Sequence, residues 1–356
     1  MKAVLDENFL EAEGKKVLFY HTDTDGICSA ALFTKFFPGF MTVPLEGPVL
    51  DRRLMKSLVE MKPGLLVLLD LPMDQEADKL EKLMNTSLNT RILMIDHHVP
   101  EKDMNSQRFV HINPRLEREI YIPASVLVYR LFRDLGKDIE KFIWIAAVGV
   151  IGDYAFRDCQ DILDECAKRY PKACAGGRGK AKIYDIARNL MSTVIYQGNK
   201  GAGHSLEIMR SAEGYKDVTE NRYFITCNDR VEREIDKAVA EFRKKAKEYP
   251  NLGLFVYRID NRLNIASSVS TKLSERNPDK IIFVVKQSKQ MMKISARYQE
   301  ARAEGINLND LLKKAVKGIG TGGGHIRAAG AVVPKKDWPE FERRVMKLIE
   351  DLTITS

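Results

Sequence analysis

The sequence predicts an α/β protein with two domains, the first built on a doubly wound parallel sheet and the second a smaller α/β domain. Three observations favour this class. The chain has 356 residues, which is more than one ordinary core holds. Residues 65–69 and 92–95 are apolar throughout, as expected of strands buried on both faces of a parallel sheet. Helical patterns separate these apolar runs, which is typical of βαβ units.

The first domain alternates strand and helix patterns over residues 15–155. An apolar strand at 16–20 ends in a turn of Asp and Gly residues. Residues 171–182 are rich in Gly, Lys and Arg without an acid, which predicts a loop. The predicted helices of this domain lie at about residues 27–37, 75–84, 124–135, 139–154, 184–194 and 205–211.

A second alternation of strands and helices begins at residue 252. The segment before it, 230–249, mixes Arg and Lys with Asp and Glu at three- and four-residue spacing, which predicts an exposed amphipathic helix between the domains. We therefore expect domains at 1–228 and 251–356, joined by a helical connector at 229–250. The predicted strands of the second domain are 253–257, 281–285 and 292–296, and its predicted helices are 266–276, 308–316 and 338–352.

The composition is that of a globular chain without a membrane partner. No apolar run approaches the ~20 residues that span a bilayer. The first residues lack the apolar stretch of a signal peptide, so we expect a cytoplasmic protein. Five cysteines without a C-x-x-C spacing indicate free thiols. A net charge of +8 favours a polyanionic partner, although basic chains are also typical of surface ion-pair networks.

Acidic and histidine side chains follow three of the predicted strands. If these strands are neighbours, the side chains converge at one edge of the sheet. Carboxylates and imidazoles together suit Mn²⁺, Mg²⁺ or Zn²⁺, and a carboxylate-rich set favours Mn²⁺. Taken alone, Asp23 and Asp25 are more typical of turn and helix-cap residues, and Asp70 could simply end a strand. The strand-end groups are His21, Asp23, Asp25, Asp70, Asp96, His97 and His98, and Asp153 joins them from the end of an apolar helix.

A glycine-rich run at residues 322–330 offers a different chemistry. Its three successive glycines expose backbone N–H groups, and a helix predicted to start at about His325 would aim its positive end at an anion. Arg297 is suited to clamp a phosphate with two hydrogen bonds. Such a run can also simply turn the chain. The acid-free segment 280–299 is likewise either a track for a phosphate backbone or a solvated strand face.

These motifs occur in a fixed order along the chain. The strand-end set consists of His21-x-Asp23-x-Asp25-Gly26, Asp70, Asp96-His97-His98 and Gly152-Asp153, and the later set consists of Ser295-Ala296-Arg297 and Gly322-Gly323-Gly324-His325-x-x-Ala328-Ala329-Gly330. Together they resemble the DHH phosphoesterase superfamily with its DHH-associated C-terminal domain, as in RecJ-like exonucleases, oligoribonuclease-type members and archaeal-type representatives. Asn113-Pro114-Arg115 and Pro123-Ala124-Ser125 also resemble family segments. His21 departs from the pattern, because RecJ-type enzymes commonly have Asp there.

The resemblance implies a two-metal hydrolase whose site lies in a cleft between the two domains. It implies that His21, Asp23 and Asp70 hold one divalent ion, and that Asp25, Asp70, His97 and Asp153 hold the second, with Asp70 bridging. Asp96 would orient His97, and His98 would face the substrate phosphate as a hydrogen-bond donor or proton source. The implied substrate-binding residues are Ser295, Arg297, Gly322, Gly323, Gly324 and His325.

The resulting hypothesis is a Mn²⁺-dependent phosphodiesterase with two ions, for which Mg²⁺ is a possible substitute. It would release mononucleotides from short or single-stranded oligonucleotides, with DNA and RNA both left open, and a homodimer is possible. The alternative keeps the chemistry but takes cyclic or linear dinucleotides or 3′-phosphorylated nucleotides. A non-catalytic replication scaffold is disfavoured, because every expected ligand position is filled. An inorganic pyrophosphatase is disfavoured too, because those relatives lack the glycine run.

Overall fold

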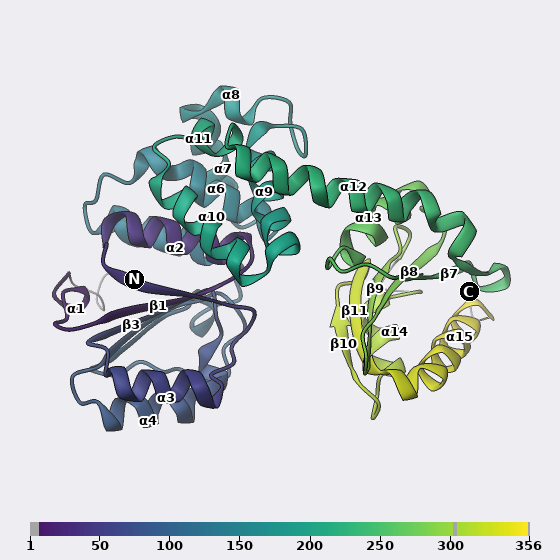
Figure 1. Cartoon of the computed structure of the whole chain (residues 1–356), viewed down its shortest axis with the longest axis horizontal. Coiled ribbons are helices and arrows are strands. Elements are labelled where there is room, and N and C mark those ends of the chain that lie inside the picture. The colour runs from purple at the N-terminus through teal and green to yellow at the C-terminus, as the bar shows by residue number, and fades with distance from the viewer. Residues whose placement is uncertain (1–6, 302–304, 355–356) are drawn as a thin grey trace. The chain divides into compact units, whose positions relative to one another are not determined.

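The computed structural model describes residues 7–301 and 305–354, and the chain divides into two compact units. The N-terminal unit is Met1–Asn228 and the C-terminal unit is Asp229–Ser356. Each unit has its own sheet and its own core, so each is described by itself (Figure 1).

The N-terminal unit contains a five-stranded sheet whose strands are all parallel, in the order β2-β1-β3-β4-β5. The predicted α/β class is thus confirmed. The chain leaves β1 toward β2 and then crosses back to β3, so the topological switch point lies between β1 and β3. Ligands of open α/β sheets bind at such a point. The strands are β1 (Lys16–His21), β2 (Phe40–Leu45), β3 (Leu65–Leu69), β4 (Arg91–Ile95) and β5 (Phe109–Ile112).

Helices cover both faces of this sheet (Figure 1). Alternate residues of each strand enter different cores: Leu66 and Leu68 face α3 and α4, while Leu65, Val67 and Leu69 face the layer of α2, α5 and α6. This two-sided burial explains why the strands are wholly apolar. The helices of the unit are α1 (Glu7–Leu10), α2 (Thr24–Phe36), α3 (Arg52–Met61), α4 (Ala77–Thr86), α5 (Ala124–Asp134), α6 (Ile143–Gly152), α7 (Gln160–Arg169), α8 (Pro171–Cys174), α9 (Lys182–Gln197), α10 (Asn199–Ser211) and α11 (Tyr215–Thr219), with short 3₁₀ turns at Met73–Glu76, Pro114–Leu116 and Glu140–Phe142.

Several elements of this unit were not predicted. Strand β2 lies at a sheet edge, is half-exposed and contains Pro44, so it lacks the apolar run that identified β1 and β3. Strand β5 has only four residues and includes His111. Helix α8 occupies the first part of the segment predicted as a loop, and the loop itself is confined to residues 175–181.

The C-terminal unit contains a six-stranded mixed sheet in the order β10-β11-β9-β8-β7-β6, in which only β7 and β8 pair in parallel. Helix α13 packs on one face, and α14 and α15 cover the other (Figure 1). The elements are β6 (Lys247–Tyr249), β7 (Leu254–Ile259), α13 (Ala266–Arg276), β8 (Ile281–Gln287), β9 (Met291–Arg297), α14 (Leu308–Ala315), β10 (Thr321–Gly324), β11 (Ala328–Pro334) and α15 (Trp338–Ile354), with 3₁₀ turns at Pro250–Leu252 and Lys335–Asp337.

The segment expected to be an amphipathic connector is a helix with one buried face. Helix α12 (Arg222–Lys245) contains the division between the units, and most of its apolar residues are buried, whereas Ile225 is exposed. Phe242 lies 5.1 Å from Phe255 of β7 between ring centroids, and the Tyr257 hydroxyl donates to the Ala238 carbonyl at 2.8 Å. The predicted amphipathic helix is thus present: its charged residues lie on the solvated side, and its apolar stripe packs against a sheet face.

Within the described part of the chain, no helix has the length and apolarity needed to cross a membrane. All five cysteines are free thiols, as their spacing indicated.

Candidate metal centre

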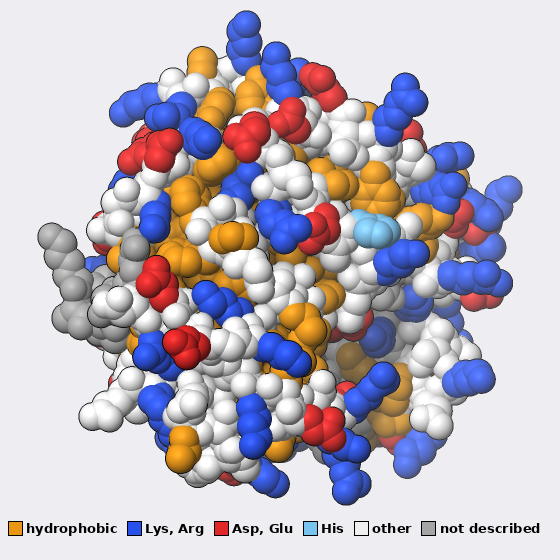
Figure 2. Space-filling model, turned by 60° about the vertical axis from the view of Figure 1, so that its left-hand side comes forward, with side chains coloured by type: hydrophobic (Ala, Val, Ile, Leu, Met, Phe, Trp, Pro, Cys, Tyr) orange, Lys and Arg blue, Asp and Glu red, His pale blue; other side chains and the backbone are white. Residues whose placement is uncertain are grey.

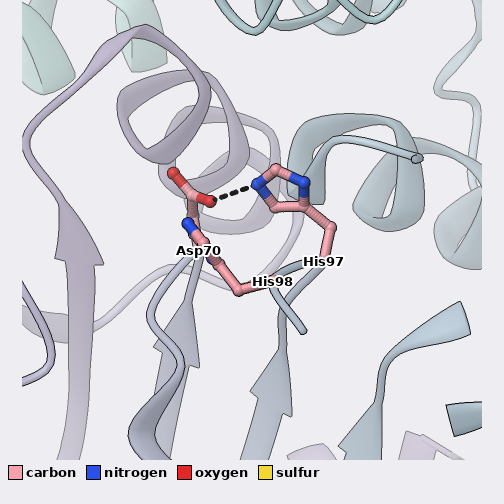
Figure 3. Close-up of side chains that lie close together, drawn as sticks. All are labelled: Asp70, His97 and His98. Carbon is pink, nitrogen blue, oxygen red and sulfur yellow. Dashed lines mark hydrogen bonds and ion pairs between the residues drawn. The ribbon is translucent and has the colours of Figure 1, made fainter. Parts of the chain in front are cut away.

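Neighbouring strands β3 and β4 bring Asp70 and His97 together at the carboxyl edge of the parallel sheet. Asp70 Oδ1 lies 3.0 Å from His97 Nε2, and Figure 3 shows the two side chains pointing toward one another from adjacent strand ends. Both side chains are buried. Asp70 has a φ of 58°, a conformation that few residues other than glycine adopt, and such strain is typical of functional sites.

The first group around Asp70 contains His21 and Asp23. His21 ends β1, and its Nδ1 lies 2.9 Å from Asp23 Oδ2 and 3.5 Å from Asp70 Oδ2. Asp23 also caps α2, because its Oδ1 accepts the Gly26 N–H at 2.9 Å. A Cβ on Gly26 would lie 2.1 Å from the His21 carbonyl oxygen, so only glycine permits this turn. The cap and ligand interpretations of Asp23 are therefore compatible.

The second group consists of Asp25, His97 and Asp153. Asp153 follows α6, and its Oδ2 lies 3.2 Å from His97 Nε2. Asp25 is fully buried in the first turn of α2, where it accepts the Ala124 N–H at 2.6 Å. It also accepts the backbone N–H and the hydroxyl of Ser125, so the start of α5 holds this carboxylate in place.

Gly149 leaves the space that this arrangement needs. A Cβ there would lie 2.0 Å from Ser125 Oγ and 2.6 Å from Asp25 Oδ1. Gly149 thus allows α6 to approach Asp25 and Ser125 closely enough for Asp153 to reach His97.

The electrostatics of the centre favour a cation. Burial and the charges of Asp25 and Asp70 raise the pKa of Asp153 to about 9. Burial, with the charges of Asp23 and Asp25, also raises the pKa of Asp70 well above its usual range. Burial alone would lower the pKa of His21, but bonds to Asp23 and Asp70 raise it to about 11. Carboxylates so close together repel unless protons or a metal neutralise them.

The donor set fits divalent metal ions. Carboxylate and imidazole ligands suit Mn²⁺ and related ions, and Asp70 is shared between neighbouring groups. The buried Oδ2 of Asp70 has only the long 3.5 Å contact with His21 Nδ1 among the described residues, which leaves it free to ligate a metal ion.

The expected pairing of Asp96 with His97 was wrong. Asp96 Oδ1 lies 2.8 Å from His98 Nδ1, and its Oδ2 accepts the His98 backbone N–H at 3.0 Å. His97 instead turns inward toward Asp70 and Asp153. Burial would lower the pKa of His98, but the bond and charge of Asp96 raise it. The His98 side chain is 45% exposed, so it is the accessible imidazole of the pair.

Tyr121 belongs to the centre but was not predicted. Its hydroxyl donates to Asp153 Oδ2 at 3.3 Å, and its ring lies edge-on against His97 at 4.8 Å between centroids. It lies outside any regular element, two residues before the Pro123-Ala124-Ser125 segment, so no periodicity indicated it. That segment was the available signal, because it also holds Asp25.

In the C-terminal unit, Ser295 and Arg297 lie on the face of β9 that meets α13. The Ser295 and Ser270 hydroxyls lie 2.9 Å apart, and the Arg297 guanidinium donates to Ser267 Oγ at 2.9 Å. Gly330 stands opposite Ser295 in register, and Gly323 opposite Gly330, so the sheet beside Ser295 is bare backbone.

The helix predicted to begin at His325 is absent. Gly322, Gly323 and Gly324 instead form β10, an edge strand that pairs antiparallel with β11 across a turn at residues 325–327. The prediction was wrong because Ala328–Pro334 alternates buried and half-exposed side chains and therefore forms a strand. Gly324 has a φ of 145°, and its N–H donates to Asn309 Oδ1 at 3.1 Å. His325 lies exposed in the turn.

The geometry agrees with the comparisons with known proteins. Residues 15–154 match the DHH family, N-terminal domain, and residues 251–353 match the DHHA1 domain. The chain belongs to the DHH phosphoesterase superfamily, a class of phosphate-ester hydrolases, and it carries the DHHA1 domain. No curated protein sequence matches the chain.

Solved structures share the fold at low sequence identity. RecJ from Thermus thermophilus in complex with Mn²⁺ matches with a TM-score of 0.72 and 20% identity, over 97% of this chain and 54% of that one, so this chain spans about half the length of that relative. Exonuclease RecJ bound to manganese matches with a TM-score of 0.67 and 20% identity, over 97% and 93% of the two chains. The pGpG-specific phosphodiesterase PggH from Vibrio cholerae matches with a TM-score of 0.54 and 13% identity, over 95% and 100%.

Proposed function

We propose that this protein is a Mn²⁺-dependent phosphodiesterase that releases mononucleotides from short or single-stranded oligonucleotides. The observation that carries the proposal is the set of overlapping ligand groups that share Asp70 and His97 near the switch point of the sheet. His21 and Asp23 join Asp70, Asp25 and Asp153 join His97, and His98 lies close to both shared residues. Divalent ions bound there would supply Lewis acidity for the phosphate and would lower the pKa of the attacking water.

The two groups suggest a division of ligands. His21, Asp23 and Asp70 would hold one ion, because their ligand atoms all lie within 4.8 Å of one another. Asp25, His97 and Asp153 form a group of the same size, and Asp70 lies 3.0 Å from His97, where it would bridge to a second ion. Mg²⁺ is a possible substitute in a set this rich in carboxylates.

His98 is the group best placed to protonate the leaving oxygen. It is exposed on one side, and Asp96 holds its Nδ1, which leaves Nε2 directed away from that carboxylate. Asp96 therefore positions His98 and favours its protonated form. This role replaces the expected one of orienting His97.

The DHHA1 domain supplies groups suited to a phosphate or terminal nucleotide. Ser295 and Arg297 share one sheet face, and Arg297 is already held by α13, so little side-chain freedom is lost on binding. Gly322, Gly323, Gly324 and His325 would contribute a close backbone surface and an imidazole from an edge hairpin, rather than a helix terminus. The N–H groups of Gly324 and His325 are already bonded to Asn309 and Ala328, so the imidazole is the freer donor.

Small nucleotides are the second candidate substrate class. The supporting observation is that PggH, described as pGpG-specific, is matched over its whole length, so a chain of this extent suits a dinucleotide. One RecJ exonuclease structure is matched over 93% of its length, so coverage supports both candidates. A scaffold role is disfavoured, because the ligand groups are complete.

The test is hydrolysis of end-labelled oligonucleotides of two to twenty units, of cyclic dinucleotides and of 3′-phosphorylated nucleotides. Each substrate is incubated with Mn²⁺, Mg²⁺ or EDTA. We expect mononucleotides from the oligomers in Mn²⁺ and no release in EDTA. Hydrolysis of dinucleotides alone would establish the second candidate, and hydrolysis in EDTA would overturn both.

A further inference from the structure

A strained and exposed tyrosine lies directly beside the metal centre. Tyr154 follows Asp153, has a φ of 55°, and is 75% exposed. It occupies the position after the helix cap of α6, where the Ala155 N–H donates to the Val150 carbonyl and the Tyr154 N–H to the Ile151 carbonyl. Glycine is favoured at this position of such a cap. Neither the backbone conformation nor burial explains a tyrosine there, so its ring is available to a ligand.

The ring begins a series of aromatic and cationic contacts that leads away from the centre. Tyr154 and Phe156 lie 6.2 Å apart between ring centroids, and the Arg178 guanidinium lies 3.8 Å over the Phe156 ring. This contact is close enough for a cation–π interaction. Arg178 belongs to the glycine-rich loop that follows α8, so the contact fixes that loop beside the residues that leave Asp153.

This basic segment, residues 168–182, has no acidic residue and six cations, all exposed: Lys168, Arg169, Lys172, Arg178, Lys180 and Lys182. Among the described residues, none of the six forms an ion pair with a carboxylate. Lys and Arg side chains stand out over much of the face in Figure 2, but acidic side chains are interspersed with them. A run without acids is therefore a local feature. Asp164, Glu165 and Asp185 flank it, but within the run six cations have no carboxylate to offset them, so it can attract a polyanion.

Tyr154 thus offers an exposed ring beside a cationic path, whereas Phe156 is half-buried and holds Arg178 in place. Exposed aromatic rings next to cations are features by which proteins bind single-stranded nucleic acid. Bases stack on aromatic faces, and lysines and arginines follow the phosphates. A solvated surface loop would explain the charges, but not the tyrosine in a glycine conformation next to a metal ligand. A purely structural Arg178–Phe156 contact would likewise leave the Tyr154 ring unexplained.

We propose that Tyr154, Phe156 and the basic segment form a track for the part of a single-stranded oligonucleotide that extends beyond the metal centre. Tyr154 stacks on a base near the scissile phosphate, and Arg178 with the exposed lysines contacts the phosphates that follow. The track rests on the proposed function for its substrate class, and it adds a binding surface that a dinucleotide is too short to fill.

The first test separates the ring from the backbone. Tyr154→Gly removes the ring and relieves the strained backbone, so we expect its melting temperature to rise by about 2 °C. We expect its Kd for a fluorescent single-stranded 12-mer, measured by anisotropy in EDTA, to rise about tenfold. Lys62→Gly is the matched control, because Lys62 is exposed and has a φ of 47° at the end of α3. It should leave the Kd unchanged. An unchanged Kd in Tyr154→Gly would overturn the stacking role.

The second test removes charge. The triple variant Lys172→Ala/Arg178→Ala/Lys180→Ala should weaken binding of the 12-mer and reduce the slope of log K against log salt by about 2. The control is Lys15→Ala/Lys62→Ala/Lys82→Ala, which removes three exposed lysines before β1, after α3 and late in α4. Its slope should match that of the unmodified protein. Equal slopes of log K against log salt in the two triple variants would overturn the track. Binding of a poly-glutamate peptide as tightly as a 12-mer of the same charge would also overturn it.

The same variants distinguish this inference from the proposed function. If the unmodified protein releases mononucleotides from both the 12-mer and a dinucleotide in Mn²⁺, the proposed function stands. We compare kcat/KM for the 12-mer with kcat/KM for the dinucleotide. In Lys172→Ala/Arg178→Ala/Lys180→Ala the ratio of the first to the second should be about tenfold lower than in the unmodified protein. An unchanged ratio overturns the track alone. Loss of 12-mer binding in a protein that hydrolyses nothing would overturn the proposed function and leave the track standing.

Discussion

The metal centre and the glycine hairpin are the two regions in which the sequence concentrates its motifs, and they depend on opposite properties of their residues. The centre gathers carboxylates and imidazoles from three strand ends and two helices, and the ligand atoms of each group lie within 4.8 Å of one another. The hairpin buries almost no charge and depends on residues without side chains. We therefore expect the metal centre to be sensitive to substitutions that remove a charge but keep the side-chain volume. The hairpin should instead be sensitive to substitutions that add volume without changing the charge.

The largest effect is expected from Asp70→Asn. The substitution keeps the shape but removes the charge shared between the ligand groups, so hydrolysis should fall on the order of a hundredfold to a thousandfold. Bound Mn²⁺, measured by emission spectroscopy, should fall with it. Asp161→Asn is the control, because Asp161 is exposed in a surface pair with Arg130 and should retain activity. Normal activity in Asp70→Asn would refute the two-metal assignment.

The charge of the centre also predicts how stability depends on pH. In the folded, metal-free protein the pKa of Asp153 is raised to about 9, and that of Asp70 is raised as well. The folded state therefore binds more protons than the unfolded state. The extra protons stabilise the folded state. Their contribution to stability is complete below the unfolded carboxyl pKa of about 4, and it is lost as the pH rises through the folded pKa.

The melting temperature of the metal-free protein should accordingly fall by about 5 °C between pH 6 and pH 9. Scanning calorimetry in EDTA measures it. Saturating Mn²⁺ should flatten the dependence, because ions replace the protons. Asp70→Asn should flatten it in EDTA as well, whereas Asp161→Asn should not. A melting temperature of the metal-free protein that rises over this range would contradict the repulsion between carboxylates.

The stability of the hairpin should be sensitive to the addition of a single methyl group. A Cβ on Gly324 would lie 2.6 Å from the Ala328 carbonyl oxygen, and the φ of 145° is unfavourable for alanine. Gly324→Ala should therefore destabilise the protein by about 1–3 kcal/mol. Gly323→Ala is the matched control, since its Cβ would meet only the end of Lys313 at 3.4 Å and Asn309 Oδ1 at 3.6 Å. Equal urea midpoints for the two variants would mean that the hairpin geometry does not matter to stability.

The same contrast explains what the sequence could and could not predict. The placement of Asp70 and His97 was predictable, because wholly apolar runs identify buried parallel strands and such strands end at one edge. The partner of Asp96 was not predictable, because two histidines follow it and tertiary contacts to Asp153 decide which one turns inward. The hairpin was mispredicted because three glycines have no local preference, and the partner strand decides their conformation.

The smallest effect should come from Arg297→Ala, which sharpens the division between the two regions. Arg297 donates to Ser267 and Thr271 and is only half-buried, so its loss should alter stability little. If it contacts a substrate phosphate, removal of one charge-assisted pair should raise the KM about tenfold. Bound Mn²⁺ should remain at the level of the unmodified protein, because Arg297 belongs to the C-terminal unit and the metal ligands belong to the N-terminal one. Arg276→Ala, which removes a cation from the end of α13, should leave the KM unchanged. Loss of metal in Arg297→Ala would show that metal binding depends on a residue of the C-terminal unit. The metal centre and the hairpin face would then not have separate roles.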